Sequence, residues 1–408
     1  MSDAGAPRTP AGGGRRASAE PPTPAALDVE DAIDEAGGSI PFARFMELAL
    51  GHPEHGYYAR AGLGWGSRGD YESSPEVHPV FGLLWAGQIA ECWDLLGCPD
   101  RFDLIEVGAG SGALAVSVLH ALREHHADCF AALRPVLLDG FPRRVEEQRA
   151  ALAQRGLPAR HALLDEWLAE PEAITGVIYS NEFFDALPVH LIGRAASDDA
   201  EPEALIEWHV RRRPDGGLAL EPGAPSTPEL SHHLDRLGLG PAAGCRQELS
   251  LAATAVARSL SRRLGRGYVL TLDYGYESAE LYAPWRRDGT LMAFRDHIPQ
   301  PDPLARPGLA DLTAHVDLGA LARAFEDEGL AAAATVPQAT ALIALGLGEA
   351  VAAARSQMPG DVAAYARLRR SAEVLVDPAG LGRVRVLVAA RRAPLASLRC
   401  LRAVPTSS

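Results

Sequence analysis

An apolar segment that breaks into alternating glycines constrains the fold of this chain more than any other feature. Residues 104–119 read LIEVGAGSGALAVSVL, in which Gly108, Gly110 and Gly112 separate a strand-like run from a helix-like one. Glycine lets a ligand approach the backbone, and the helix that follows directs its positive end at that ligand. The segment therefore predicts the first strand, turn and helix of an open α/β sheet, with these glycines as the floor of a nucleotide-like pocket.

Strand-like and helix-like segments alternate from residue 102 onward. Strands separated by helices favour a parallel sheet with both faces covered. The predicted fold class is α/β, with a Rossmann-like, doubly wound sheet whose binding crevice lies at the carboxyl ends of the strands. The apolar runs typical of strands occur at 102–108, 135–140, 176–189, 267–275 and 383–392.

Composition shifts divide the 408 residues into four predicted parts. The first is rich in glycine, proline, alanine and serine without periodicity, which is typical of disorder. The parts are a disordered tail (1–28), an N-terminal helical and loop cap segment (29–100), a core with an inserted α+β subregion at about 195–260 (101–395), and a flexible C-terminus (396–408).

Capping residues and turn residues predict elements within these parts. The sequence predicts one helix over 39–50 and another that Ser74 caps and that runs to about Gly97. In the insertion, residues 204–220 read ALIEWHVRRRPDGGLAL, which predicts a hairpin with an Asp-Gly-Gly turn. A further helix of the insertion is expected to be closed by Gly265.

Charge, cysteine count and hydropathy exclude several classes of protein. The net charge of -14 argues against nucleic-acid binding, which needs a basic face. The five cysteines form no CxxC pair, so we expect reduced structural thiols and no metal site. No apolar stretch approaches the roughly 20 residues that cross a bilayer, and we therefore expect a soluble, cytoplasmic protein without a membrane span.

The glycine turn permits two kinds of ligand. GAGSGA fits GxGxG, the pattern of S-adenosylmethionine (SAM) sites, and also GxGxxA, a dinucleotide fingerprint. Glu106 precedes the first glycine by two residues, where a carboxylate can face the amino-acid end of SAM. Asp139 ends the second strand, where a carboxylate can take ribose hydroxyls in either case. We favour SAM, and an NAD-dependent oxidoreductase stays an alternative.

A second polar constellation, YSNEFFDALPVH at 179–190, follows the third predicted strand and opens into the same crevice. A guanidinium acceptor is protonated at any working pH and carries five fixed donors. Glu182 and Asp185, beside Asn181, would pair with it and orient one nitrogen toward a methyl donor. The alternative is a polar loop that caps the next helix.

Several longer segments together resemble one known family. They are GYY, GDYESSPEVHPVFG, EVGAGSGAL, NEFFDALPVH, LDYGY and PGLADLTAHVDL, and they occur in that order between about residues 39 and 392. They resemble the MidA-like proteins, SAM-dependent methyltransferases of the mitochondrial complex I assembly factor type. The resemblance implies a class I methyltransferase fold and SAM as cofactor. It also implies symmetric dimethylation of an arginine on a core subunit of respiratory complex I, in support of its assembly.

The resemblance also assigns roles to residues that match its motifs. It implies that Glu106 and the three glycines hold SAM and that Asp139 stands where the family usually has glutamate. Asn181 and Glu182 would face the donor at the strand end.

A segment before the core, with Asp70 and Ser74, would fold over the cofactor. The chain departs from the family at Ala109 and Ser111, where the family often has proline and arginine.

Several questions stay open at this stage. Asp273, His297 and Asp311 serve either structure or acceptor binding. A small-molecule methyltransferase and a non-catalytic SAM-binding assembly factor remain alternatives. The expected partner is an arginine-bearing protein substrate, the location is the mitochondrial matrix if the source is a eukaryote, and the oligomeric state is not predicted.

Overall fold

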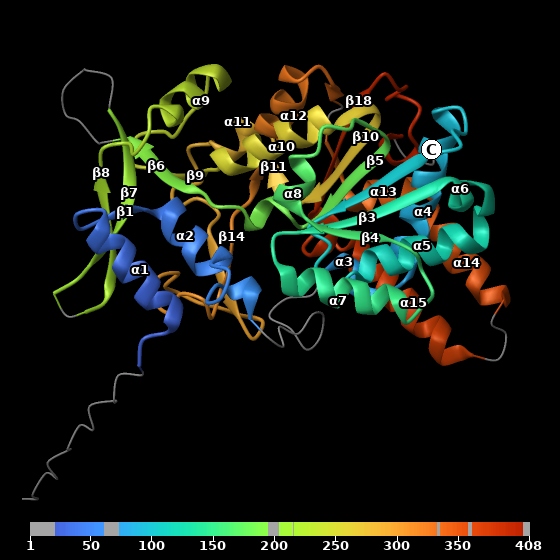
Figure 1. The fold of residues 1–408 in the computed structure, drawn as a ribbon, viewed down its shortest axis with the longest axis horizontal. Helices are drawn as coiled ribbons and strands as arrows, with labels where there is room; N and C mark the ends of the chain where they lie inside the picture. The colour runs from blue at the N-terminus through green and yellow to red at the C-terminus, as the bar shows by residue number, and fades with distance from the viewer. Residues whose placement is uncertain are drawn as a thin grey trace, which may run out of the picture.

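Two lobes make up the protein. The main lobe contains an eight-stranded sheet and the second lobe a five-stranded sheet, and the two lie side by side in Figure 1. We define the second lobe as the described residues of 21–60, 190–249 and 282–314, and the main lobe as the remainder. The computed structural model describes residues 21–60, 73–194, 204–214, 216–332, 335–357 and 361–402.

The main sheet confirms the predicted α/β class. Its strands are β2 (Phe102–Val107), β3 (Leu133–Asp139), β4 (Arg160–Leu163), β5 (Ile174–Asn181), β10 (Leu264–Asp273), β16 (Ala331–Ala332), β17 (Val336–Pro337) and β18 (Arg385–Arg391). Five of them are parallel, in the order β4–β3–β2–β5–β10, and β18 is antiparallel to β10. The chain leaves β2 toward β3 and later returns to its other side as β5, so the binding crevice lies between the carboxyl ends of β2 and β5.

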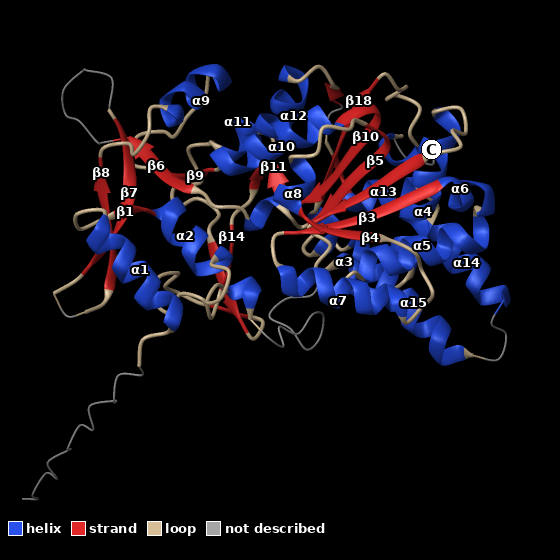
Figure 2. Ribbon diagram, in the orientation of Figure 1, coloured by secondary structure: helices blue, strands red, loops and turns tan. Residues whose placement is uncertain are grey.

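Apolar cores fill both faces of this sheet, because successive strand residues point to opposite faces. On β2, Leu104 belongs to one core and Ile105 and Val107 to the other. Figure 2 shows helices against both faces. The first core takes α4 (Val80–Leu95), α5 (Ala113–His125), α6 (Ala127–Ala132), α7 (Pro142–Ala153), α13 (Gln338–Ala344), α14 (Leu347–Gln357) and α15 (Val362–Val376). The second takes α8 (Leu164–Leu168), α10 (Leu251–Arg263) and α12 (Leu318–Asp327).

The second lobe joins three distant stretches of chain around its own apolar core, which includes Phe45, Leu191 and Leu312. Its sheet has the order β1–β7–β6–β9 with β8 on β7, and β7 and β8 confirm the predicted hairpin. Its elements are α1 (Pro24–Glu35), β1 (Ile40–Pro41), α2 (Phe42–Gly51), η1 (Tyr57–Ala59), β6 (His190–Arg194), β7 (Leu205–Arg212), β8 (Leu218–Gly223), α9 (Glu229–Leu237), β9 (Arg246–Leu249), β12 (Met292–Arg295), β13 (Ile298–Pro299) and β14 (Asp311–Thr313).

Short elements line the boundary between the lobes or close the chain. They are α3 (Ser74–Val77), η3 (Phe184–Ala186), β11 (Gly275–Tyr276), α11 (Ser278–Leu281), β15 (Val316–Asp317), η4 (Leu381–Arg383) and η5 (Arg399–Leu401). Among the described helices, none alone combines the length and apolar character that a membrane crossing requires. Only α13 and α14 taken together reach that threshold, and they bend by 53°.

Near both ends of the part that the structure describes, the contacts differ from the expectation. The helix α1 begins inside the predicted tail, because Thr23 accepts the Ala26 N–H and donates its hydroxyl to the Pro307 carbonyl at 2.7 Å. At the other end, Cys400 is buried and donates its N–H to Gln88 Oε1 at 2.9 Å. The predicted flexible C-terminus is therefore packed on α4 as far as the structure describes it. Both contacts join residues far apart in sequence, which composition does not report.

Local chemistry corrects the predicted cap segment and two helix ends. Residues of α1 and α2 belong to the second lobe, whereas α3 and α4 pack in the main lobe. The predicted helix after Ser74 breaks at His78, which is extended because Pro79 follows it. The helix α10 passes directly into β10, so Gly265 lies in a strand and closes no helix.

We predict that Gly176 tolerates no side chain, because an added Cβ would lie 1.9 Å from the carbonyl oxygen of Asp103 on β2. Gly176→Ala should lower the free energy of unfolding by about 3 kcal/mol or more, since β5 must move away from β2. Gly348→Ala is the control: its Cβ would meet nothing within 4 Å, and alanine favours the helix α14. Urea unfolding of both variants measures the effect, and equal midpoints would contradict this strand pairing.

Candidate active site

The glycine turn after β2 has the backbone that its sequence predicts. Gly108, Gly110 and Gly112 have φ angles of 70°, 53° and 79°, which L side chains rarely adopt. The N–H groups of Gly108 and Ala109 donate to the Leu138 carbonyl at 3.0 and 3.1 Å. A Cβ at Gly108 would come within 2.5 Å of Phe183 Cδ2, so the turn and the segment after β5 are in direct contact.

A cavity of about 290 Å³ lies over this turn, and we call it the donor cavity. The main lobe supplies its floor with the glycine turn, Glu106 and Asp139. The second lobe supplies the opposite wall, which includes Met46, Leu50 and Tyr58. The candidate cofactor site is therefore built between the lobes, and no single stretch of sequence indicates the second wall.

Glu106 is buried at the base of the donor cavity. Tyr179, on the neighbouring strand β5, donates its hydroxyl to Glu106 Oε2 at 2.6 Å. Burial raises the pKa of Glu106 to about 8, because a carboxylate loses hydration there. A ligand ammonium would supply the missing counter-charge, which suits the amino-acid end of SAM. The sequence did not indicate that Tyr179 orients this carboxylate.

Asp139 joins the end of β3 to the glycine turn. Its Oδ2 accepts the Gly110 N–H and the Gln148 side-chain amide, both at 3.1 Å, and its Oδ1 accepts the Phe141 N–H at 3.3 Å. Burial raises the pKa of Asp139 to about 6. The carboxylate still lines the cavity, so it can face a ribose while it fixes the turn.

Glu182 directly follows β5 and has an unusual backbone conformation. Its φ is 50°, which is uncommon for any residue other than glycine, and its N–H donates to the Leu272 carbonyl at 2.8 Å. Its Oε1 accepts the Asn181 amide at 3.0 Å and the Ser74 N–H at 3.3 Å. Burial raises the pKa of Glu182 to about 8. The structure thus brings Ser74 to Asn181 and Glu182, from which it is about 108 residues distant in the sequence.

Asp273 holds the segment that follows Glu182. This fully buried carboxylate accepts the N–H groups of Phe183, Phe184 and Tyr274 at 3.1, 2.8 and 3.0 Å. Burial raises its pKa to about 7. The sequence left open whether Asp273 serves structure or acceptor binding. Its observed contacts are with the backbone, which indicates a structural role.

A second cavity, of about 310 Å³, adjoins the first, and we call it the acceptor cavity. It shares Tyr58 and Glu182 with the donor cavity. Asp185 and Asp311 are buried in its wall, and the Tyr58 hydroxyl donates to Asp311 Oδ1 at 2.8 Å. Burial raises the pKa of Asp185 well above its ordinary range, and the nearby Asp273 raises it further. The aromatic side chains of the wall are Tyr58, Tyr274, Phe294 and His315.

Two candidates lie elsewhere. His297 is exposed at the turn between β12 and β13, with φ of 61°, and does not line either cavity. Asp70 lies outside the described residues, so its predicted contact with the cofactor stays a prediction.

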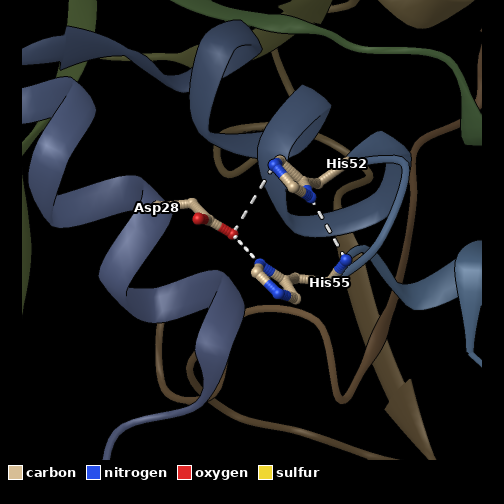
Figure 3. Close-up of side chains that lie close together, drawn as sticks. All are labelled: Asp28, His52 and His55. Carbon is tan, nitrogen blue, oxygen red and sulfur yellow. Dashed lines mark hydrogen bonds and ion pairs between the residues drawn. The ribbon is translucent and has the colours of Figure 1, made fainter.

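One cluster among the described residues has metal-ligand composition. Asp28, His52 and His55 tie α1 to the turn after α2 (Figure 3). Asp28 Oδ2 lies 2.7 Å from His55 Nδ1 and 3.8 Å from His52 Nε2. His52 Nδ1 accepts the N–H groups of Glu54 and His55, so Nε2 carries the hydrogen of a neutral ring. That nitrogen then has no lone pair for a cation, and the hydrogen bonds of the cluster fit a structural role.

The family and the solved structures agree with this geometry. The model of a family described as "Putative S-adenosyl-L-methionine-dependent methyltransferase" matches residues 84–336. A "likely methyl transferase" from Burkholderia thailandensis, solved with bound S-adenosyl-homocysteine, superposes with a TM-score of 0.81 at 30% identity. The match covers 95% of this chain and 98% of that one. S-adenosyl-homocysteine is SAM without its methyl group, so this likeness supports SAM over NAD.

Curated relatives share most of the chain as well. A Drosophila melanogaster protein named protein arginine methyltransferase NDUFAF7 homolog, mitochondrial, is 28% identical over 321 residues, which are 72% of this chain and 68% of that protein. Protein arginine methyltransferase NDUFAF7, mitochondrial, of Danio rerio is 25% identical over 379 residues, which are 85% of this chain and 82% of that protein.

We predict that Glu106 makes stability depend on pH. Its folded pKa of about 8 exceeds its ordinary 4.5, so the folded protein keeps a proton that the unfolded chain releases between these values. The resulting stabilisation is full below pH 4.5 and is lost as pH rises through 8. Without cofactor, the melting temperature of the wild type should therefore fall more steeply from pH 5.5 to 8.5 than that of Glu106→Gln.

Glu54→Gln, which changes an exposed carboxylate, is the control for this comparison and should keep the wild-type slope. Equal slopes for the wild type and Glu106→Gln would contradict the prediction. Thermal unfolding followed by fluorescence at several pH values is the measurement.

Proposed function

The chain belongs to this family of S-adenosyl-L-methionine-dependent methyltransferases, and from that premise we propose that it methylates arginine side chains of a protein. SAM, when bound, supplies a methyl group on a positively charged sulfur. The residues present fit it: open backbone at Gly108, a buried carboxylate at Glu106 for an ammonium and one at Asp139 for a ribose. We place the methyl group at the junction of the two cavities, beside Glu182.

The observation that carries the proposal is the acidic acceptor cavity. Glu182, Asp185 and Asp311 all line it, and burial in one cavity sets their negative charges against one another. A guanidinium is charged at any working pH, and its burial requires carboxylates that take its fixed N–H donors. Its entry would relieve the repulsion among the three carboxylates. Arg383 on η4 lines the same cavity and supplies one positive charge, and a neutral small-molecule acceptor would add none.

The chemistry of such a step assigns Glu182 its role. A new bond forms between an arginine nitrogen and the methyl carbon, the carbon–sulfur bond breaks, and the nitrogen loses one proton. Glu182 lies where the cavities meet, so it can orient that nitrogen and accept the proton. Asp185 and Asp311 would hold the other nitrogens, and the aromatic walls would exclude water.

We extend the proposal to the substrate and the setting. The relatives named NDUFAF7 are protein arginine methyltransferases by name, and their names place them in mitochondria. With the resemblance to MidA-like proteins, this supports symmetric dimethylation of an arginine on a complex I core subunit. The protein would act in the cytoplasm of a bacterium or in the matrix of a mitochondrion.

We predict that labelled SAM, incubated with the protein and a cell extract that lacks it, marks an arginine that mass spectrometry can locate. Glu182→Gln should reduce the rate by about 100-fold, the scale of proton transfer by a positioned group. Calorimetry should show that this variant still binds SAM. Label on a small molecule would favour the alternative methyltransferase, and SAM binding without any label would favour a non-catalytic assembly factor.

The pH dependence gives a separate prediction. Because the pKa of Glu182 in the free protein is about 8, its carboxylate is ionised only above that pH. The value of kcat/KM for the arginine substrate should therefore rise with pH up to about 8 and then level, since kcat/KM reports the free enzyme. A profile that is flat from pH 6 to 9 would contradict the role of an ionised Glu182.

A further inference from the structure

One oxygen of Glu182 is fixed from two sides. Oε1 accepts the amide of Asn181, its neighbour on β5, and the backbone N–H of Ser74, the first residue of α3. Oε2 takes no hydrogen bond from any described residue, so it is the oxygen left for a substrate. The direction of Oε2 therefore depends on how firmly Ser74 is held.

The side chain of Gln338 contacts the side chain of Ser74. Both side chains are fully buried, and they meet across 264 residues of sequence. The Gln338 side-chain nitrogen donates to the carbonyls of Leu375 on α15 and Leu381 on η4, at 3.2 and 3.1 Å. The same nitrogen lies 3.0 Å from the Ser74 hydroxyl oxygen, and Oε1 lies 3.2 Å from it, so the amide contacts this hydroxyl through both of its polar atoms. The backbone N–H of Gln338 donates to the Val384 carbonyl, and this bond fixes the start of α13.

These hydrogen bonds link three C-terminal elements to Glu182, which lies where the two cavities meet. The elements α13, α15 and η4 anchor the Gln338 amide, the amide anchors the Ser74 hydroxyl, and the Ser74 N–H bonds Glu182. The helix α3 has only four residues and no side-chain cap of its own, so its first residue gains its position from this contact. A buried amide lowers stability unless its donors and its acceptor all have hydrogen-bond partners. The side-chain amide of Gln338 has a partner for each of them.

We propose that Gln338 is a positioning residue for Glu182, acting through the Ser74 hydroxyl to fix the N–H that orients the carboxylate. The proposal rests on the proposed function, since it assumes that Glu182 orients the acceptor. It differs from that function because Gln338 touches neither cavity.

Several charged and titratable groups face Glu182 and set the background of its titration. Burial raises its pKa and the charges of Asp273 and Glu76 raise it further, whereas the Asn181 amide and the Ser74 N–H lower it. Loss of the Ser74 bond should therefore raise the pKa of Glu182 further. The groups are Glu76 on α3, Asp185 on η3, Asp273 and Tyr274 at the end of β10, Arg383 on η4, His315 beside Tyr274, and Tyr58 and Asp311 across the acceptor cavity.

The experiment removes the amide and leaves its volume. Gln338→Met should lower kcat about ten-fold, the scale of one hydrogen bond to a charged group, and leave the KM for SAM within two-fold. The rising limb of its kcat/KM profile should move to higher pH. Ser74→Ala should reproduce both effects, and the double variant should be no slower than the slower single variant. In a Glu182→Gln background, Gln338→Met should change the rate by less than two-fold.

Gln247→Met is the matched control. Gln247 is another buried glutamine, on β9, whose amide donates to the Leu281 carbonyl at 3.3 Å, outside both cavities. Its substitution removes that hydrogen bond and a buried oxygen without a partner among the described residues, and it should leave kcat and the pH profile unchanged whatever its effect on the melting temperature. If Gln338→Met behaves in the same way, its role is structural and the proposal is overturned.

A measurement without turnover separates this proposal from the proposed function. The carboxyl carbon of Glu182, labelled with 13C and assigned by its absence in Glu182→Gln, reports its pKa by NMR. Gln338→Met should raise that pKa, and an unchanged pKa would overturn the positioning role even in an active enzyme. If the wild type methylates no arginine, the proposed function fails, while the NMR titration still decides whether Gln338 controls Glu182.

Discussion

One buried carboxylate aligns the two halves of the candidate site. Asp273 accepts three backbone N–H groups, those of Phe183 and Phe184 after β5 and that of Tyr274 directly after β10. On the donor side this places Phe183 against Gly108, so close that no side chain fits between them. On the acceptor side it leaves Asp185 in the cavity wall and Glu182 at the junction. A shift of the Asp273 carboxylate would therefore change the shape of both cavities.

The site concentrates negative charge where stability alone would avoid it. Glu106, Asp185 and Asp311 are buried and Glu182 is partly buried, and loss of hydration raises the pKa of Glu106, Glu182 and Asp185. Buried carboxylates lower stability unless they are paired or protonated. The ammonium and sulfonium of SAM and a guanidinium would each bring positive charge to this region. The same carboxylates that lower the stability of the free protein would thus favour the binding of SAM and of a guanidinium.

Sequence reasoning succeeded where the signal is local and failed where it is distant. The glycine turn and the strands β2, β3, β5 and β10 follow from apolar runs and turn residues, which act within a few residues. The strand β4 was missed because Arg-His-Ala-Leu carries no apolar run. The second lobe was missed as a unit because its core joins three separate stretches. Ser74 and Gln338 meet across 264 residues, and no spacing in the sequence reports such a contact.

The two lobes supply different parts of the candidate site. The main lobe supplies the glycine floor, Glu106 and Glu182. The second lobe supplies Tyr58, which borders both cavities, and Asp311, which binds the Tyr58 hydroxyl. The lobes meet at Tyr58 itself, whose carbonyl accepts a hydrogen bond from the buried Arg144 of α7 at 3.2 Å. Since that bond fixes Tyr58 relative to the donor cavity, docking of the second lobe would, in the proposed reaction, set the boundary between the two cavities.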